Sequence, residues 1–424
     1  MIVFSLCAGH VLTRIASHNH PPPTTAEISE DRFVSSLRGA ARDEFHRSAR
    51  SIFTEAVANH AVPPGVAYRS VKHALYNEKR RNLPQTPATR DDIEIGGAWG
   101  STLRGDRFVI PGPDKDMLLF ATDLNIRKLA TCNLWLMDGT FKCVPTLFGQ
   151  FYTIHGEIGG YIVPLFFALL PNKQATMYRA MFQRLVSYAT ILGVQLQPVE
   201  LLTDCEAAVL TVVKDLWPNA SHRICYFHFV QANYRYATEN CGLTVPYRED
   251  PQVQSLLRRF WALAYLPVIS IGLMFSELSA EAASHPMHSV GLLLYVAYFE
   301  RQWMRNNSVP KKLWNIHHVA AGKRTNNDVE GWNSKWNRAI GKSGPGYYEA
   351  IIQLRMQQAD TENIFEQVDA CVPPPPCRPK VVKKAQRIQS YIDRWMSPPA
   401  SDVDHNDVID TARLLRVLAA IGTM

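Results

Sequence analysis

The sequence lacks the features that define several large classes of protein. No stretch approaches the roughly 18 apolar residues that a transmembrane helix needs, because the best candidates, Tyr161–Leu170 and Val290–Phe299, are too short. The eight cysteines are scattered and form no Cys-x-x-Cys pair, which favours reduced intracellular thiols over a disulfide framework. Met1–Leu12 is apolar without a basic leading region, so we expect no signal peptide. Ordinary apolar (46%) and charged (20%) fractions exclude a mainly disordered, collagen-like or coiled-coil chain.

Positive charge is present, and it is clustered. The 424 residues include 45 basic and 38 acidic side chains, for a formal net charge of +7. Residues 301–344 hold nine basic and two acidic side chains, and residues 66–90 hold six and one. Clustered positive charge is typical of surfaces that bind a polyanion such as nucleic acid. The alternative interpretation is that these residues form solvated faces of helices.

The order of apolar patterns predicts an α/β fold. Residues 25–60 have helical spacing, a basic helix follows at about 66–82, and residues 84–115 are rich in proline, glycine and charge, as in a linker. Short apolar runs then predict strands that alternate with helices, and residues 250–305 read as mostly helical. We therefore expect a mixed sheet flanked by helices. The predicted strands lie at 134–137, 148–156, 161–170, 199–203 and 222–225.

Three acidic residues follow or begin predicted elements at positions where a site can form. Asp138 ends the apolar run Leu134–Met137, where a buried acid is costly unless it is paired or binds a metal. Asp204 ends a predicted strand, and its alternative role is that of a helix N-cap. Glu330 begins a predicted helix and shares a polar face with Asn333 and Asn337, opposite an apolar face. Three such carboxylates suit two Mg²⁺ ions, although spacing alone does not select them from 38 acids.

Two longer motifs carry a resemblance to a known family. The run from Asp138 to Gly156 and the run from Arg324 to Trp332 closely resemble the core of MULE (Mutator-like element) transposases. Weaker matches lie between them, in the same order, at Thr203–Ala208 and Cys225–His228. The resemblance covers about residues 130–355. It implies an RNase H-like fold with a helical insertion and a DDE triad formed by Asp138, Asp204 and Glu330.

The resemblance also implies an activity and its partners. A transposase of this family uses Mg²⁺ or Mn²⁺, in a two-metal site held by the triad, to cleave DNA strands and transfer them. Its partners are double-stranded DNA at transposon ends and target, it acts in the nucleus, and it is expected to be a homo-oligomer. The alternative function is that of a domesticated, catalytically silent DNA-binding protein. The residues expected to contact DNA are Lys311, Lys312, Lys323, Arg324, Lys335 and Arg338.

Two further elements are compared with the family. Cys225 and His228 match a Cys-x-x-His element; on one face of a helix they could hold zinc or have a structural or DNA-contact role. No second pair of ligands is evident, and Cys241 and His222 are candidates only by proximity. At the N-terminus, His18-Asn19-His20 resembles the end of a FLYWCH zinc finger whose aromatic-rich first half is absent, which indicates a remnant.

These observations predict four regions. They are a truncated FLYWCH-type remnant (1–24), a basic helical region with a linker (25–115), an RNase H-like DDE domain (116–360, with a helical insertion at about 240–320), and a Pro-rich, basic linker with a C-terminal tail (361–424).

Overall fold

The chain divides into two compact units, Met1–Thr86 and Pro87–Met424. The computed structural model describes residues 6–7, 10–11, 21–44, 47–81, 83–113, 115–320, 323–396 and 411–421. Within the first unit, the short strands β1 (Leu6–Cys7) and β2 (His10–Val11) pair in antiparallel fashion. His18 and His20, which suggested a zinc-finger remnant, lie outside the described residues.

Three helices make up most of the first unit: α1 (Thr25–Asp43), α2 (Ala49–Asn59) and α3 (Tyr68–Arg81). The helical pattern predicted over 25–60 is two helices, because the chain breaks after Asp43 and Ser48 caps the start of α2. The basic helix predicted at about 66–82 is α3. Its apolar side, with Val71 and Leu75, is buried against α1 and α2.

The opposite side of α3 carries positive charge. Arg69, Lys72 and Arg80 are exposed and lie on one stripe, because they are three, then eight residues apart on a helix of 3.6 residues per turn. Val71 and Leu75 point the other way. The interpretation of this segment as a polyanion-binding surface remains a prediction.

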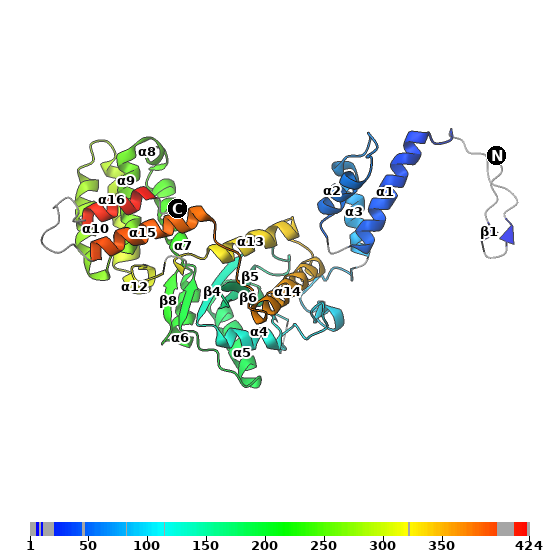
Figure 1. Cartoon of the computed structure of the whole chain (residues 1–424), viewed down its shortest axis with the longest axis horizontal. Coiled ribbons are helices and arrows are strands. Elements are labelled where there is room, and N and C mark those ends of the chain that lie inside the picture. Colours follow the sequence, from blue (N-terminus) through cyan, green and yellow to red (C-terminus); the bar gives the residue numbers. More distant parts are fainter. Residues whose placement is uncertain are drawn as a thin grey trace. The chain divides into compact units, whose positions relative to one another are not determined.

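The second unit is built on a mixed six-stranded sheet with the order β3-β6-β5-β4-β7-β8 (Figure 1). Strands β4 to β6 are antiparallel neighbours, whereas β7 and β8 run parallel to β4. Gly159 and Gly160 have positive φ angles of 56° and 82°, which is the geometry of a tight hairpin turn between β5 and β6. The strands are β3 (Leu118–Phe120), β4 (Leu134–Thr140), β5 (Gln150–Ile158), β6 (Tyr161–Leu170), β7 (Glu200–Thr203) and β8 (Ser221–Ile224).

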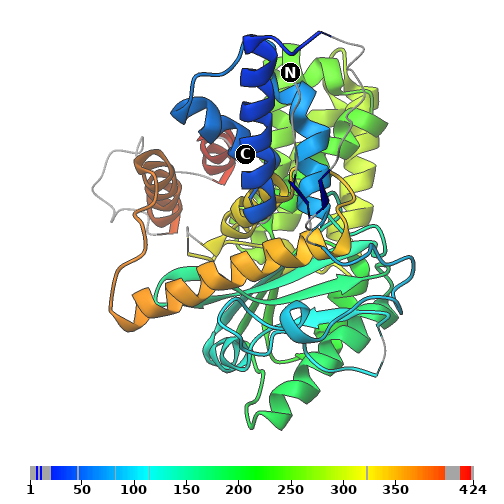
Figure 2. The same ribbon diagram turned by 90° about the vertical axis from the view of Figure 1, so that its right-hand side faces the viewer.

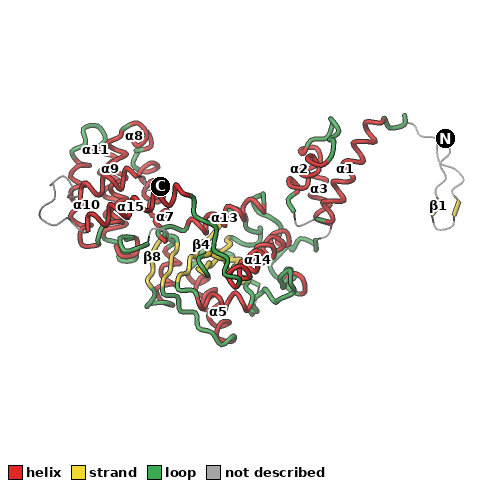
Figure 3. The backbone as a smooth tube through the Cα atoms, viewed as in Figure 1, coloured by secondary structure: helices red, strands yellow, loops and turns green. Residues whose placement is uncertain are grey.

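Helices cover both faces of this sheet (Figure 3). On one face α4 (Asp123–Thr131), α5 (Ala175–Ile191) and α6 (Ala207–Leu216) share a core with alternate residues of β4, Trp135 and Met137. On the other face Val329 of α13 (Asn327–Ile340) packs on Leu134 and Leu136. Helix α14 (Tyr347–Asp369) runs across the sheet beside β6 (Figure 2). The architecture is consistent with the expected RNase H-like α/β fold.

A helical body with an aromatic core lies beyond β8, as expected for residues 240–320. Phe229, Trp261, Tyr295 and Trp314 are among its fully buried side chains. No helix in the described part of the chain is both long and apolar enough to cross a bilayer. The body contains α7 (Tyr226–Asn240), α8 (Thr244–Glu249), α9 (Pro251–Ala262), η2 (Leu263–Tyr265), α10 (Val268–Ala283), α11 (Ser289–Phe299), the π-helical turn η3 (Glu300–Met304) and α12 (Lys311–Trp314).

The segment predicted as a linker at 84–115 is partly integrated into the second unit. It contains a 3-10 turn, η1 (Gly97–Trp99), and Phe108 and Ile110 are fully buried. Val109 forms an isolated bridge with Phe120 of β3. The composition of this segment did not indicate that it contains core residues, since proline, glycine and charged residues surround the apolar ones.

The region predicted as a linker and tail at 361–424 also differs in the structure. Helix α14 continues to Asp369, and two more helices follow, α15 (Pro379–Met396) and α16 (Thr411–Ile421). Ile388 and Ile392 of α15 join the core of the helical body, and α16 packs on α9. The reason is the helical spacing of apolar residues within a segment that reads as basic.

Candidate active site

The parallel pairing of β4 and β7 brings two aspartates to one edge of the sheet. Leu136 of β4 is in register with Leu202 of β7. Two residues further along each chain are Asp138, near the end of β4, and Asp204, just after β7. Because parallel strands point the same way, both carboxylates lie at the carboxyl-terminal edge of neighbouring central strands. Ligands bind at this edge in open α/β sheets.

Asp138 is a buried carboxylate held by two donors. Only 7% of the residue is exposed. Its Oδ1 accepts a hydrogen bond from the Gly139 amide (2.9 Å), and its Oδ2 accepts one from Asn333 Nδ2 (2.7 Å). Burial, followed by the negative charge of Asp204, raises the pKa of Asp138 to about 7. The two aspartates are therefore close enough to repel each other.

Asp204 is more than the helix cap that its position in the sequence allowed. Helix α6 begins at Ala207 with Glu206 as its N-cap residue, and Asp204 Oδ1 accepts a hydrogen bond from the Glu206 amide (3.2 Å). The second carboxylate oxygen, Oδ2, accepts no hydrogen bond from the described residues. Burial raises the pKa of Asp204, whereas the neighbouring His228 and Lys173 oppose that shift.

Helix α13 adds the third carboxylate from the other side. Trp336 is buried against Phe151 and donates its Nε1 hydrogen to the Cys143 carbonyl (3.1 Å), which fixes the rotation of the helix. The polar face then turns toward β4, so that Asn333 reaches Asp138. Glu330, one turn earlier, raises the pKa of Asp138 through its charge.

Glu330 Oε1 is buried and accepts no hydrogen bond from the described residues. Burial raises the pKa of this carboxyl group. Asp328 lies in the same helical turn but is exposed, as expected for a side chain about 200° away around the helix. The structure therefore brings together Asp138, Asp204 and Glu330, the residues predicted as a triad, and leaves Asp328 outside.

The chemistry of this donor set fits divalent cations. The charges of Asp204 and Glu330 both raise the pKa of the buried Asp138, and Glu330 Oε1 accepts no hydrogen bond from the described residues. The three carboxylates therefore lie near one another, although the ligand atoms found within 4.8 Å of each other are those of Cys225, His228 and Glu330. Mg²⁺ and Mn²⁺ prefer hard oxygen ligands of this kind. A cation held by these carboxylates would offset the burial and the repulsion that together raise the pKa of Asp138.

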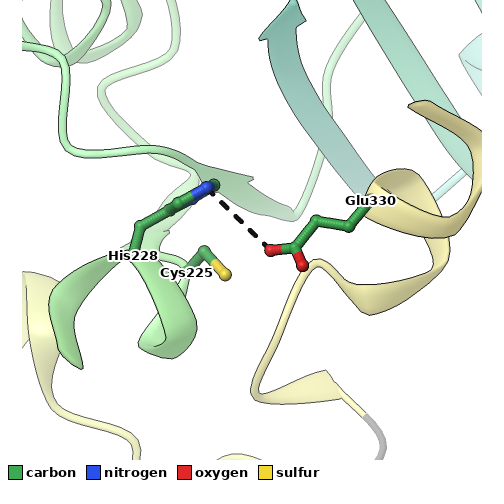
Figure 4. A group of neighbouring side chains, drawn as sticks. All are labelled: Cys225, His228 and Glu330. Atoms are coloured by element: carbon green, nitrogen blue, oxygen red, sulfur yellow. Dashed lines mark ion pairs between the residues drawn. The ribbon is translucent and has the colours of Figure 1, made fainter. Parts of the chain in front are cut away.

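Cys225 and His228 lie beside Glu330 (Figure 4). Ligand atoms of these three residues lie within 4.8 Å of one another, and His228 Nε2 is 3.9 Å from Glu330 Oε1. Cys225 Sγ accepts a hydrogen bond from the Asn326 amide (3.2 Å), and burial raises the pKa of this thiol to about 11. The thiol thus links the start of α7 to the start of α13.

A fourth ligand for a tetrahedral zinc site is not found among the described residues. Cys241 follows the far end of α7, roughly 24 Å along the helix axis from Cys225. His222 Nε2 is within 3.0 Å of Thr203 Oγ1 and belongs to a different face of β8. Neither candidate suggested by proximity in the sequence completes the set, and the structural role of Cys225 is the one with a visible contact.

Two residues at this edge were not singled out from the sequence. Lys173, in the loop after β6, lowers the pKa of both Asp204 and Glu206 through its charge. Its Nζ lies 3.2 Å from the centre of the Phe141 ring, and both side chains are exposed. The sequence could not show that Lys173 lies beside the carboxylates, because 35 residues separate Lys173 from Asp138.

The basic residues predicted to contact DNA occupy several environments. Arg324 is 4% exposed, and its guanidinium donates to the Val319 carbonyl and to Gln389 Oε1. Arg324 therefore connects α15 to the segment before α13 and does not face solvent. This burial differs from the prediction that Arg324 contacts DNA. Lys323 pairs with Glu157 and Lys335 with Asp360, whereas Lys311, Lys312 and Arg338 have no ion pair among the described residues.

Comparison with known proteins identifies the central part of this unit. The model of the MULE transposase domain matches residues 134–232. These residues form a MULE transposase domain. The MULE domain contains both aspartates, Cys225 and His228, and it ends before Glu330 is reached. It indicates an origin from a Mutator-like transposase, a kind of protein that binds DNA and acts as a polynucleotidyl transferase.

The comparisons give no support to a FLYWCH zinc finger at residues 1–24. No curated protein is detectably similar to the chain. The resemblance drawn from the sequence therefore holds for the MULE domain, and the zinc-finger part of it is left without support.

Proposed function

We propose that this protein is a DDE-type transposase that cleaves DNA strands and transfers them. The observation that carries the proposal is the meeting of Asp138, Asp204 and Glu330 at one edge of the MULE domain's sheet. Two of these residues follow neighbouring parallel strands, and the third is presented by α13. Asn333 holds Asp138 in place from the same helix.

The three carboxylates would hold Mg²⁺ or Mn²⁺. Such ions, when bound, activate water and stabilise the charge that develops on the attacking and leaving oxygens of a phosphodiester. In the cleavage step, water attacks the phosphorus atom and the bond to the 3′-oxygen breaks, which leaves a 3′-hydroxyl and a 5′-phosphate. In the transfer step, that 3′-hydroxyl attacks a target phosphodiester and displaces its 3′-oxygen, so no covalent enzyme intermediate is needed.

Other residues of the site suit the handling of DNA. The Lys173 ammonium group is exposed beside the aspartates, where it can pair with a backbone phosphate and offset the negative charge of the carboxylates. The Phe141 ring is 45% exposed and carries the Lys173 ammonium group over one face, and exposed aromatic rings can stack on unpaired bases. The substrate that we propose is duplex DNA, at transposon ends and at a target, and the place of action that we propose is the nucleus.

The proposal is tested with duplex DNA that carries the terminal inverted repeats flanking the gene. Wild-type protein should nick this duplex in Mg²⁺ or Mn²⁺ and join the labelled strand to a plasmid. Asp138→Asn, Asp204→Asn and Glu330→Gln should each abolish both reactions while DNA binding persists. Asp328→Asn is the matched control, since it removes a carboxylate from the same turn of α13 without reaching the site.

Two results would contradict the proposal. Cleavage that survives Glu330→Gln but not Asp328→Asn would show that the third ligand is misassigned. Wild-type protein that binds the terminal repeats tightly and never cleaves them, in either metal, would identify a silent DNA-binding protein that retains the fold.

A further inference from the structure

The helical body exposes an unusual amount of apolar surface on two adjacent helices. Among the described residues, nineteen large hydrophobic side chains are exposed, and seven of them fall within residues 268–294. They come from α10, α11 and the turn that joins them, and these helices pack against each other. The seven are Val268, Ile269, Leu273, Met287, Val290, Leu293 and Leu294.

Within each helix the exposed residues follow one stripe. On α10, Ile269 (91% exposed) and Leu273 (68%) are one turn apart. On α11, Val290 (76%) and Leu294 (54%) are also one turn apart. Spacing of four residues places side chains on the same face of a helix. The inner faces of both helices, which include Ile271 and Tyr295, are buried in the helical body, so each helix is apolar on two sides.

Charge is almost absent from this surface. Helix α11 contains no charged residue, and α10 contains only Glu277 and Glu281. Glu281 is occupied by an ion pair with Arg259. The turn between the helices holds His285 and His288, both beside Asp250, and a surface without lysine or arginine does not suit the DNA backbone. Apolar surface of this kind marks a contact with another apolar surface, most often that of a protein.

We propose that the α10–α11 surface is the interface through which two copies of this chain associate. The seven side chains expose on the order of 700 Å², close to the roughly 800 Å² that each partner buries in an interface of standard size. An apolar surface is best covered by another apolar surface, and a second copy of this chain offers one of the same area. A twofold axis brings the same patch of each copy together, and two helix pairs then pack as a four-helix bundle.

A small residue in the stripe favours close approach of the helices. Gly272 lies between Ile269 and Leu273 on the outer side of α10, and a Cβ atom added there would meet nothing within 4 Å. Packing within the chain therefore does not require a glycine at this position. The inference names the surface for the homo-oligomer expected of this family, and it does not depend on strand cleavage.

The test measures the association of the full chain by sedimentation equilibrium across a range of concentrations. Wild-type protein should form a dimer. The double substitution Ile269→Glu and Leu273→Glu should weaken the dimer at least about 100-fold, because each copy would then bury two unpaired carboxylates at the interface. Ile191→Glu, at a similarly exposed apolar residue on α5 (78% exposed), is the matched control and should leave the dimer intact.

A second variant separates loss of association from loss of folding. Gly272→Lys places a charge in the stripe, and lysine has a higher helix propensity than glycine, so the fold should keep or gain thermal stability while the dimer is lost. A monomeric wild-type protein, or a dimer that persists in both variants, overturns the proposal. Dimerisation is read without DNA, so an inactive but dimeric protein refutes the proposed catalysis and leaves this interface standing.

Discussion

Replacing Asp138 with asparagine should stabilise the metal-free protein at neutral pH, although it removes a residue of the proposed site. Burial and the charge of Asp204 raise the pKa of this carboxyl group from an ordinary 3.8 to about 7. An acid whose pKa is raised by folding costs stability once it ionises. The penalty is absent below about pH 4, grows as the pH rises, and is complete above about pH 7.

The size of the effect follows from the two pKa values. Their difference corresponds to about 4 kcal/mol at pH 7.5, or a rise in Tm on the order of 5 °C for a unit of this length. Asparagine keeps the size of the side chain and still accepts from the Gly139 amide. Its own amide can donate to Asn333 Oδ1, which is buried without a partner, once the Asn333 amide turns over.

Tryptophan fluorescence is the suitable assay. All nine tryptophans lie between residues 99 and 395, so the signal reports the unfolding of the second unit alone. In EDTA, Asp138→Asn should melt higher than wild type at pH 7.5, and the gap should shrink at pH 5. Asp328→Asn should show a smaller gain, because burial raises the pKa of Asp328 without a neighbouring carboxylate to add to it, and because its charge lies favourably near the helix N-terminus. The reasoning would be refuted if Asp138→Asn were less stable than wild type at pH 7.5. It would also be refuted if the difference in Tm between the two proteins did not change with pH.

Three further predictions concern neighbouring residues. Asn333→Ala should slow cleavage about 10- to 100-fold without weakening DNA binding, because a hydrogen bond to a charged group is lost, whereas Asn337→Ala, one turn further along α13, should have little effect in the same kinetic assay. Lys173→Gln should lessen the slope of log affinity against log salt by about 0.9 if it neutralises one phosphate; an unchanged slope shows that it does not contact DNA. Purified protein should contain far less than one zinc per chain by elemental analysis, because only three candidate ligands lie together among the described residues and burial raises the pKa of the Cys225 thiol; stoichiometric zinc that Cys225→Ala removes would assign the cluster to that metal.

The sequence predicted the central strands and both aspartates, and the reason is local. The sequences of β4 and β6 contain continuous apolar runs, Leu134–Met137 and Tyr161–Leu170, as strands covered on both faces do, and β7 has Leu201 and Leu202 at its centre. Asp138 is two residues from the end of β4, and Asp204 directly follows β7, so both lie close to the same edge of the sheet. The position of Glu330 followed from helical spacing, since Val329 and Trp336 fix which face of α13 is buried.

The parts that escaped prediction depend on distant partners. Strand β3 has three residues and exists because Leu118–Phe120 pairs with β6. The sequence of α15 has the composition of a basic linker. Only the tertiary packing shows that Ile388 and Ile392 belong to the core of the helical body. Likewise, the burial of Arg324 and the approach of Lys173 to Asp204 arise from loops whose course no local pattern encodes.

The central claim is that Asp138, Asp204 and Glu330 act together as one centre for divalent metal ions. The most direct measurement is a titration of the metal-free protein with Mn²⁺, with free Mn²⁺ followed by electron paramagnetic resonance. Wild-type protein should take up about two Mn²⁺ per chain. Asp138→Asn and Glu330→Gln should each weaken that uptake strongly, and Asp328→Asn should bind as wild type does. Uptake that is the same in all four proteins would contradict the account.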